Sequence, residues 1–248
     1  MKIVMTIAGS DSSAGAGIQQ DLKTITHMGC YGATVITAIT AQNTKGVSSV
    51  MPVPAEVVRA QMEAVLSDLH VDAIKIGMIP NREVAVAVTL CLMDYMQSVR
   101  GERPHIVLDP VMISTSGTRL MSEECISYVR ENLMPMCTLV TPNLPEAEVL
   151  PPPYPTAFLV KGGHGSGEEL VDTLYCIDGS SREYRTQRIE STNLHGTGCT
   201  LSSAIACALA KGLPLTDAVE VAKEEINTGI KGGRNLNIGK GNGPLWLF

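Results

Sequence analysis

Hydrophobic and polar positions along this chain alternate between two periods. Short apolar runs such as "KIVMTIA" (2–8) and "ATVITAITA" (33–41) are typical of buried strands, whereas residues 14–29 carry Ile18, Leu22 and Ile25 at helical spacing. The same reading predicts strands at 72–79, 105–109 and 137–143 and helices at 54–69, 82–99, 122–134 and 143–150. This order of elements indicates a mostly parallel sheet with helices on both faces.

The pattern changes after residue 156. Three strand-like runs follow in quick succession, at 157–163, 168–176 and 182–190, and "IDGSS" separates the last two. This spacing predicts an antiparallel hairpin at one edge of the sheet. Two helices, at about 198–211 and 214–231, complete the pattern. Because no repeat or linker divides the chain, we expect one domain over residues 1–248.

One connection is too short for this pattern. The segment "TPNLPEAEVLPPPYPT" lies between the strand that ends near Val140 and the strand that begins near Ala157. A crossover between parallel strands normally contains a full helix. Here only residues 143–150 can be helical before the prolines impose an extended path. Either the crossover is reduced, or a crossover helix near 150–156 is missing from the chain, and we favour the second explanation.

Composition and charge exclude several classes of function. Hydrophobic residues make up 44% of the chain and charged ones 18%, which is typical of a globular protein. The net charge of −6 and the aromatic content of 4% oppose a nucleic-acid partner. No run reaches the roughly 18 apolar residues of a membrane span, and "MKIVMTIAGSD" is too short for a signal peptide. The seven cysteines form no CxxC pair, so we expect a cytoplasmic protein.

Small and polar residues follow the predicted strands at their carboxyl ends, where parallel sheets bind ligands. The segments are "AGSDSSAGAGIQQD", "AQNTKG", "IGMI", "LDPVM", "TPNLPE" and "VKGGHG". At the same edge, "HGTGCT" opens the helix at 198–211. Unpaired N–H groups and the helix dipole favour an anion at such a helix N-terminus. The sequence therefore predicts an anion hole made by the backbone of Gly196, Thr197, Gly198 and Cys199.

These motifs resemble those of the ribokinase-like superfamily and, within it, the hydroxymethylpyrimidine/phosphomethylpyrimidine kinases of thiamine biosynthesis. The resemblance rests on "TIAGSDSSAGAGIQQDLKT", "VITAITAQNT", "KIGMI", "VLDPVM", "TPNLPEAEVL", "VKGGH" and "HGTGCTLSSAIA", in the family's order over nearly the whole chain. It implies a three-layer α/β/α sandwich. It also implies phosphoryl transfer from Mg-ATP to 4-amino-5-hydroxymethyl-2-methylpyrimidine, and then to the monophosphate to give the diphosphate.

Cys199 is the candidate base of this reaction. Many sugar kinases of the superfamily have Asp at this place, and the resemblance to the pyrimidine branch implies Cys instead. A helix N-terminus lowers the pKa of a thiol, so we expect the thiolate to be favoured. The alternative is a small side chain that packs beneath the loop.

The strand ends supply candidate groups for the metal and the nucleotide. Asp109 ends an apolar strand, where its burial would be costly without a cation or hydrogen bonds, so it is a candidate metal ligand. The family's NxxE pattern fits Asn143 and Glu146, and the resemblance implies that Glu146 helps to order Mg²⁺ and phosphate, partly through water. Glu146 can also be a first-turn residue of a helix that Asn143 caps, and both roles are compatible. Lys161 either reaches the ATP phosphates or is solvated. The resemblance assigns Asn143, Lys161 and Gly163 to nucleotide binding.

Gln42 is the main candidate for binding the acceptor. Its amide complements the amino group and ring nitrogen of an aminopyrimidine, and the resemblance places the Gln of "AQNT" there. The resemblance assigns four further pocket positions, Asp21, Gly9, Met78 and Val111, although Met78 alone would be counted as core. The turn "AGAG" at 14–17 is a hypothetical site for the phosphate of the monophosphate substrate.

Other functions compete with this one. A pyridoxal kinase would have the same fold and the same ATP machinery, and Gln42 argues against it. A sugar or nucleoside kinase is disfavoured by Cys199. A non-catalytic nucleotide-binding regulator is opposed by the intact motifs, and only the short crossover supports it. The family is usually dimeric, so the expected partners are a small-molecule substrate and a second copy of the chain. The edge segment "GVSSVMPV" could pair with that copy or cover the pocket.

Overall fold

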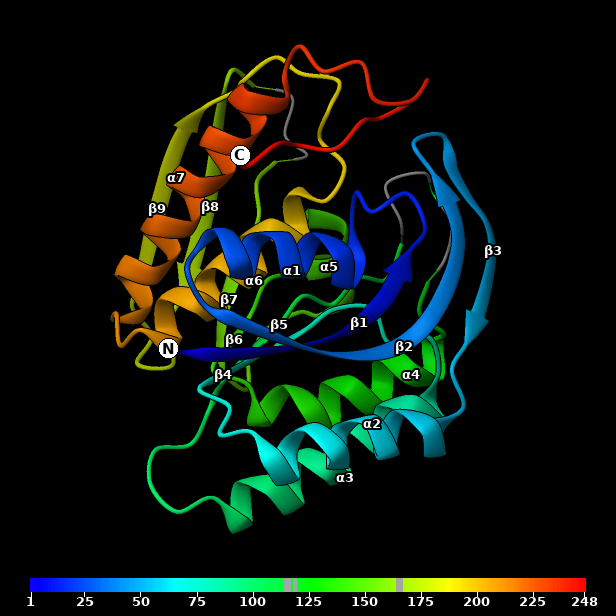
Figure 1. Cartoon of the computed structure of the whole chain (residues 1–248). Coiled ribbons are helices and arrows are strands. Elements are labelled where there is room, and N and C mark those ends of the chain that lie inside the picture. The colour runs from blue at the N-terminus through cyan, green and yellow to red at the C-terminus, as the bar shows by residue number, and fades with distance from the viewer. Residues whose placement is uncertain (114–116, 118–119, 164–166) are drawn as a thin grey trace.

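The computed structural model describes residues 1–113, 117, 120–163 and 167–248 and is built around a nine-stranded sheet (Figure 1). The strands are β1 (Ile3–Asp11), β2 (Tyr31–Asn43), β3 (Gly46–Pro52), β4 (Ala73–Ile76), β5 (His105–Leu108), β6 (Leu139–Val140), β7 (Ala157–Val160), β8 (Glu169–Tyr175) and β9 (Ser181–Gln187). Their order is β3-β2-β1-β4-β5-β6-β7-β8-β9. The six central strands, β2-β1-β4-β5-β6-β7 in sheet order, pair in parallel. The edge strands β3, β8 and β9 are antiparallel to their neighbours. The predicted antiparallel edge is confirmed.

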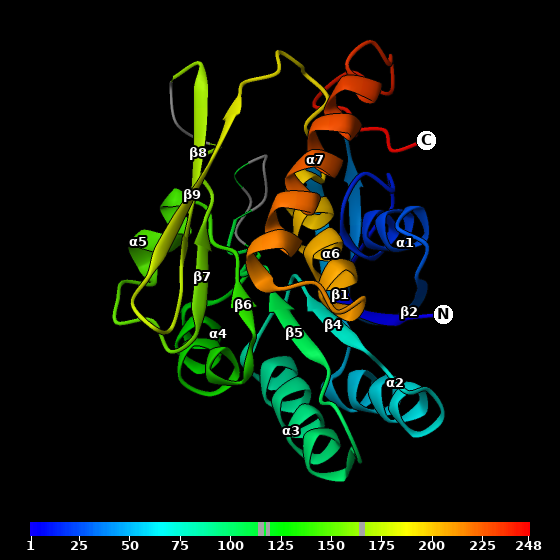
Figure 2. The same cartoon turned by 90° about the vertical axis from the view of Figure 1, so that its left-hand side faces the viewer.

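Helices cover both faces of the sheet, as the two views show (Figures 1 and 2). One face carries α1 (Gly17–His27), α6 (Thr197–Ala210) and α7 (Leu215–Gly233), and the other carries α2 (Ala55–Asp68), α3 (Arg82–Ser98) and α4 (Glu123–Tyr128). The predicted three-layer α/β/α sandwich is therefore confirmed. Within the described residues, no helix is long and apolar enough to span a bilayer.

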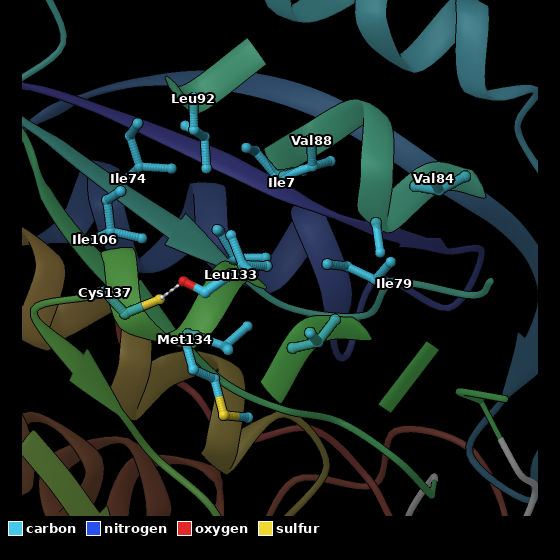
Figure 3. Packing of buried hydrophobic residues seen from close by; sticks show 14 of the residues in the cluster. Ile7, Ile74, Ile79, Val84, Val88, Leu92, Ile106, Leu133, Met134 and Cys137 are labelled. Atoms are coloured by element: carbon cyan, nitrogen blue, oxygen red, sulfur yellow. Dashed lines mark hydrogen bonds between the residues drawn. The ribbon is translucent and has the colours of Figure 1, made fainter. Parts of the chain in front are cut away.

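The hydrophobic core is divided by the sheet into two layers. Alternate residues of each central strand point to opposite faces: in β5, Ile106 packs toward α3, whereas Val107 packs toward α6. Figure 3 shows the first layer, in which Ile74 and Ile106 of the sheet meet Leu92 of α3. Since both faces are buried, these strands need the nearly continuous apolar runs seen in the sequence.

Three elements differ from the expected pattern. The predicted helix at 122–134 is α-helical only through Tyr128 and continues as a π-helical turn, Val129–Leu133, and a 3₁₀ turn. The helix expected at 14–29 begins only at Gly17, because the preceding residues form a turn around Asp11. The segment "GVSSVMPV" contains the whole of β3, which pairs with β2 of the same chain.

The short crossover is bridged without a full helix. The six-residue α5 (Leu144–Val149) leads through the proline-rich segment directly into β7, which pairs with β6 in parallel. Tyr154 of that segment stacks on Phe158 of β7 with ring centroids 4.0 Å apart and planes 10° apart. Tyr154 thus covers part of β7, where a longer crossover would place a helix. The expectation that a helix is missing here stays a prediction.

Candidate active site

A cavity of about 530 Å³ opens at the carboxyl ends of the parallel strands. Loops after these strands line it together with the first turn of α6 and one side of α7. The lining contains the predicted residues Gly9, Gln42, Met78, Asp109, Val111, Asn143, Glu146, Lys161, Gly163, Gly196, Thr197, Gly198 and Cys199. The structure therefore brings together the predicted site residues except Asp21, which lies behind the lining. Residue 164, the end of the motif "VKGGH", lies outside the described residues.

The predicted anion hole lies where the chain turns into α6. Gly196 caps this helix in the left-handed region, with φ of 86°. A Cβ at Gly196 would lie 2.0 Å from the carbonyl oxygen of Gly15, so only glycine allows the two turns to approach this closely. The N–H of Thr197 donates to the oxygen of Leu194 at 3.3 Å. The N–H groups of Gly198 and Cys199 remain in the first turn, where a helix offers them no carbonyl.

Cys199 lines the cavity, and its thiol lies close to the N-terminus of a second helix, α1, which begins at Gly17. Burial nevertheless raises the pKa of the Cys199 thiol to about 11, although Lys75 and Gly17 act to lower it. The prediction of a lowered pKa was wrong, because loss of hydration outweighs the effect of the helix N-terminus.

Asp109 and Lys161 form an ion pair beside the anion hole. Lys161 Nζ donates to Asp109 Oδ1 at 2.7 Å, and the hydroxyl of Thr141 donates to the same oxygen at 3.1 Å. The alternative of a solvated Lys161 is thereby excluded. Burial opposes its charge, but Asp109 and Glu146 outweigh burial and raise its pKa. Asp109 Oδ2 points toward the anion hole, since a Cβ at Gly198 would lie 3.2 Å from it.

Asn143 and Glu146 cap α5 reciprocally. Asn143 Oδ1 accepts the N–H of Glu146 at 2.9 Å, and Glu146 Oε2 accepts the N–H of Asn143 at 2.9 Å. Glu146 Oε1 also accepts the N–H of Met112 at 3.2 Å. Burial raises the pKa of Glu146. The capping role is confirmed, and it fixes the carboxylate at the cavity wall; the metal and nucleotide roles stay predictions.

Gln42 is held at the opposite end of the cavity from α5. Its amide oxygen accepts from the hydroxyl of Thr40 at 3.1 Å, and its amide nitrogen lies 3.1 Å from His195 Nε2. The same nitrogen of His195 lies 2.9 Å from Asp11 Oδ2. Because one ring nitrogen cannot donate to Asp11 and accept from Gln42 at the same time, only one of these two His195 contacts is a hydrogen bond in a given tautomer. Nearby, Gly9 leaves room for Met78, whose Sδ would lie 3.0 Å from a Cβ at Gly9.

The glycine-rich turn at 14–17 does not offer the expected phosphate site. Asp11 Oδ2 accepts the N–H groups of Gly15 and Ala16 at 3.1 and 2.9 Å, and Asp11 Oδ1 accepts that of Ser13 at 2.8 Å. The donors that would bind a phosphate are therefore occupied by a carboxylate of the chain itself. The hypothesis is corrected, and the sequence signal was the acidic residue directly before the turn.

Asp21 is fully buried behind the cavity and holds a lysine that the sequence reasoning missed. Both carboxylate oxygens of Asp21 lie 2.8 Å from Nζ of Lys75, which does line the cavity. The signal was present in "DAIKIGMI", where a charged residue interrupts an otherwise apolar strand. Contact of Asp21 with the acceptor stays a prediction.

The remaining wall of the cavity is largely apolar and was also missed. It is formed by Leu201 of α6, by Ile226, Asn227 and Ile230 of α7, and by Leu170 of β8. Lys223 of α7 is paired there with Asp172 of β8. These residues are spread along the buried helix α6, the amphipathic helix α7 and a hairpin, so their spacing resembles that of ordinary core residues.

The cavity thus has an apolar wall, and the N-terminus of α6, a carboxylate and a lysine converge beside it. Phosphoryl transfer requires this positioning and charge neutralisation more than covalent chemistry. The fold and the site define a small-molecule kinase. The family model described as phosphomethylpyrimidine kinase matches residues 11–156 and 152–246, and the chain belongs to this family.

Individual proteins similar to this chain include members of the family and structural neighbours of another activity. A hydroxymethylpyrimidine/phosphomethylpyrimidine kinase of Rhizobium meliloti is 46% identical over 265 residues, which cover 99% of this chain and 97% of that protein. The crystal structure of a phosphomethylpyrimidine kinase from Clostridium difficile has a TM-score of 0.78 at 38% identity and covers 93% of this chain and 100% of that one. The pyridoxal kinase of Bacillus subtilis has a TM-score of 0.85 at 30% identity and covers 100% and 97%.

The same comparisons bear on the short crossover. The alignment with the Rhizobium protein spans 265 positions, whereas the chain has 248 residues. That relative therefore carries residues that this chain lacks. The two segments matched by the family model meet at residues 152–156, within the proline-rich segment. Both findings support a crossover that is shorter than in relatives.

We expect Asn143→Ala to lower the free energy of unfolding by about 1 kcal/mol, as loss of a side-chain cap does. It should also weaken ATP binding, because α5 would no longer hold Glu146 at the cavity wall. Asn81→Ala is the matched control, since Asn81 caps α3 by accepting the N–H of Val84 at 3.0 Å, away from the cavity. Urea unfolding and the KM for ATP test both variants. An equal rise in KM in the control would contradict this explanation.

Proposed function

We propose that this protein uses ATP to phosphorylate 4-amino-5-hydroxymethyl-2-methylpyrimidine and then its monophosphate, which gives the diphosphate used in thiamine biosynthesis. The observation that carries the proposal is the placement of Gln42 in the same cavity as the anion hole and Cys199. A fixed amide can pair with the amino group and ring nitrogen of the pyrimidine. The hydroxymethyl oxygen would then lie toward Cys199, with the transferred phosphoryl group at the N-terminus of α6.

The residues at the α5 end of the cavity bind the nucleotide in this proposal. Lys161 contacts the ATP phosphates, while Asn143 and Gly163 bound the nucleotide subsite. The apolar wall of α6 and α7 suits the adenine base. Met78, Gly9 and Val111 shape the acceptor subsite, and Asp21 acts on it through Lys75.

Mg²⁺ is the proposed metal. Among the described residues there is no cluster of three or more His, Cys, Asp or Glu that could hold a metal by itself. This suits Mg²⁺, which binds through one or two carboxylates, water and substrate phosphates. Asp109 Oδ2 would be a direct or water-mediated ligand and Glu146 would assist through water. The bound metal would supply neutralisation of the phosphate charge.

Domain organisation, oligomeric state and localisation complete the proposal. The chain forms one domain around its single described sheet. It is a homodimer, which is supported by the exposed edge strand β3 with Met51 58% exposed. It is cytoplasmic, which is supported by its seven free cysteines.

A pyridoxal kinase is the second candidate. It is favoured by the similarity to pyridoxal kinase structures, such as that of Staphylococcus aureus in complex with AMP-PCP and pyridoxal, with a TM-score of 0.86 at 30% identity. The higher identity to the hydroxymethylpyrimidine kinases favours the first candidate.

The deciding experiment measures ATP consumption with the hydroxymethylpyrimidine, its monophosphate and pyridoxal. We expect turnover of both pyrimidines. Consumption with pyridoxal alone would replace the first candidate by the second. Absence of turnover while ATP still binds would favour a regulator.

Gln42→Ala should raise the KM for the pyrimidine roughly tenfold to hundredfold, because a hydrogen-bonding ligand group loses its partner. Its KM for ATP should not change. Gln61→Ala is the matched control, since the amide of Gln61 also binds β2, through both backbone groups of Ile36, but outside the cavity. Unchanged pyrimidine kinetics in Gln42→Ala would remove Gln42 from the acceptor site.

A further inference from the structure

A buried ion pair joins β4 to α1 directly behind the active-site cavity. Lys75 and Asp21 are both 0% exposed, and Nζ lies 2.8 Å from each carboxylate oxygen. Asp21 also accepts the hydroxyls of Thr6 at 2.6 Å and Ser203 at 2.9 Å. A buried pair costs considerable desolvation energy even when its hydrogen bonds are complete, so stability alone is weak grounds for having one. Its place beside the cavity suggests a role in the reaction.

The cationic partner of this pair faces the cavity. Lys75 is part of the cavity lining and Asp21 is not. Gly77 leaves room for the ammonium, since a Cβ there would lie 2.7 Å from Nζ. An ammonium has three N–H donors, and Asp21 receives two of them. Within the described part of the chain, the third has no recorded partner. This third donor is therefore left for a group that packs against the buried ammonium at the cavity lining.

Cys199 lies one helical turn before Ser203, the residue of α6 that holds Asp21 of this pair. Ser203, which donates to Asp21, follows Cys199 by four residues on α6, so both project from the same side of the helix. The charged groups that face the thiol are Lys75, Asp21, Asp109 and Lys161. After burial, which raises the pKa of Cys199, the strongest influence is Lys75, which lowers it. Asp21 and Asp109 raise it.

We propose that Lys75 is a positioning residue of the phosphoryl transfer, whose ammonium stabilises the thiolate of Cys199. The inference rests on the proposed function for the identity of the reaction. In that reaction the acceptor O–H bond breaks and its proton passes to the thiolate. The acceptor oxygen forms a bond to the γ-phosphorus of ATP, and the bond from that phosphorus to the bridging oxygen breaks, its electron pair leaving with ADP. Asp21 and Ser203 hold the ammonium in place.

The test follows alkylation of Cys199 by iodoacetamide as pH rises, resolved by peptide mass spectrometry on the full chain. In the wild type the rate should rise about tenfold per pH unit at neutral to moderately alkaline pH, because the thiolate fraction grows below the pKa of about 11. The double variant Lys75→Met/Asp21→Asn removes both charges and leaves no unpaired ion. Its Cys199 alkylation rate should fall about tenfold at each pH, and kcat should fall while the KM for ATP is unchanged. A wild-type alkylation profile, or a wild-type kcat, would overturn the proposal.

A second variant has the opposite expected sign. Asp21→Asn keeps the cation and removes the carboxylate, so alkylation of Cys199 should become faster than in the wild type. A slower or unchanged rate would overturn the proposal, even if the double variant did not fold. If the pair had only a structural role, the double variant and Asp21→Asn would not be expected to change the alkylation rate of Cys199 in opposite directions.

Lys23→Met is the matched control. Lys23 lies two residues from Asp21 on α1, but its ammonium donates to the carbonyl of Ala14 at 2.7 Å and is not among the groups that act on Cys199. Its alkylation profile should match the wild type, and a shift as large as that of the double variant would overturn the specific role of Lys75. The alkylation measurement needs no acceptor. Failure of the proposed function would therefore appear as absent turnover in the wild type, separately from the alkylation result.

Discussion

Gly196→Ala should reduce kcat about a thousandfold, the upper range for loss of an oxyanion-hole donor. The residue caps α6 with φ of 86°, and a Cβ would lie 2.0 Å from the carbonyl oxygen of Gly15. This clash is with a backbone atom, which cannot rotate away as a flexible side chain can. The turn at Gly15 and the start of α6 must therefore move apart. The N–H groups of the anion hole and the thiol of Cys199 would then shift together. Steady-state turnover and ATP binding measure the effect.

The control for this prediction is Gly212→Ala at the other end of α6. Gly212 also has a left-handed φ, of 88°, but a Cβ there would meet nothing within 4 Å. This variant should lose about 1–2 kcal/mol of stability from backbone strain and keep its kcat. If Gly196→Ala retained wild-type turnover, the anion hole would have to be placed elsewhere.

Asp109→Asn should lower kcat about a hundredfold or more, in the range of losses at preorganised electrostatic groups. The neutral amide cannot compensate the charge of Lys161, whose Nζ lies 2.7 Å from the carboxylate. The substitution also removes the negative charge from the oxygen that points toward the predicted anion hole, and this oxygen is the proposed metal ligand. Turnover measured over a range of Mg²⁺ concentrations should show a higher requirement for the metal.

Asp72→Asn provides the comparison. Asp72 pairs with Lys2 at 2.7 Å and accepts the N–H of Ile3, beside the amino ends of the strands and far from the cavity. Such a partly exposed pair contributes at most about 1 kcal/mol. Stability should fall slightly and kcat should not change. Equal losses in both variants would mean that Asp109 acts only through stability.

Sequence periodicity predicted the sheet and most helices because both faces of the central strands are buried. The strands "DAIKIGMI" and "HIVLD" are apolar where β4 and β5 pack between two helical layers. Periodicity could not predict that the helix expected at 122–134 changes at Val129 to a π-helical turn, which contacts α3. Nor could it predict how the short crossover is bridged by Tyr154 and Phe158.

The motifs predicted which loops meet at the cavity but not how each charge is balanced. The ionisation of Cys199 was predicted from its helix position, whereas burial decides it. The turn at 14–17 was predicted to bind an anion, and it does so with Asp11. Lys75 was missed, because the role of a lysine within an apolar strand cannot be inferred before its partner, Asp21 on α1, is known. Each case depends on contacts between residues distant in sequence.

The carboxylate of Asp11 has a thermodynamic consequence for ligand binding. A turn that waited for a substrate phosphate to organise it would lose about 1–2 kcal/mol of conformational entropy per residue on binding. Asp11 already holds this turn through Ser13, Gly15 and Ala16. This end of the cavity, where the acceptor is proposed to bind, is therefore partly preorganised during folding, and the affinity for a ligand there is not reduced by the entropy of ordering these turn residues.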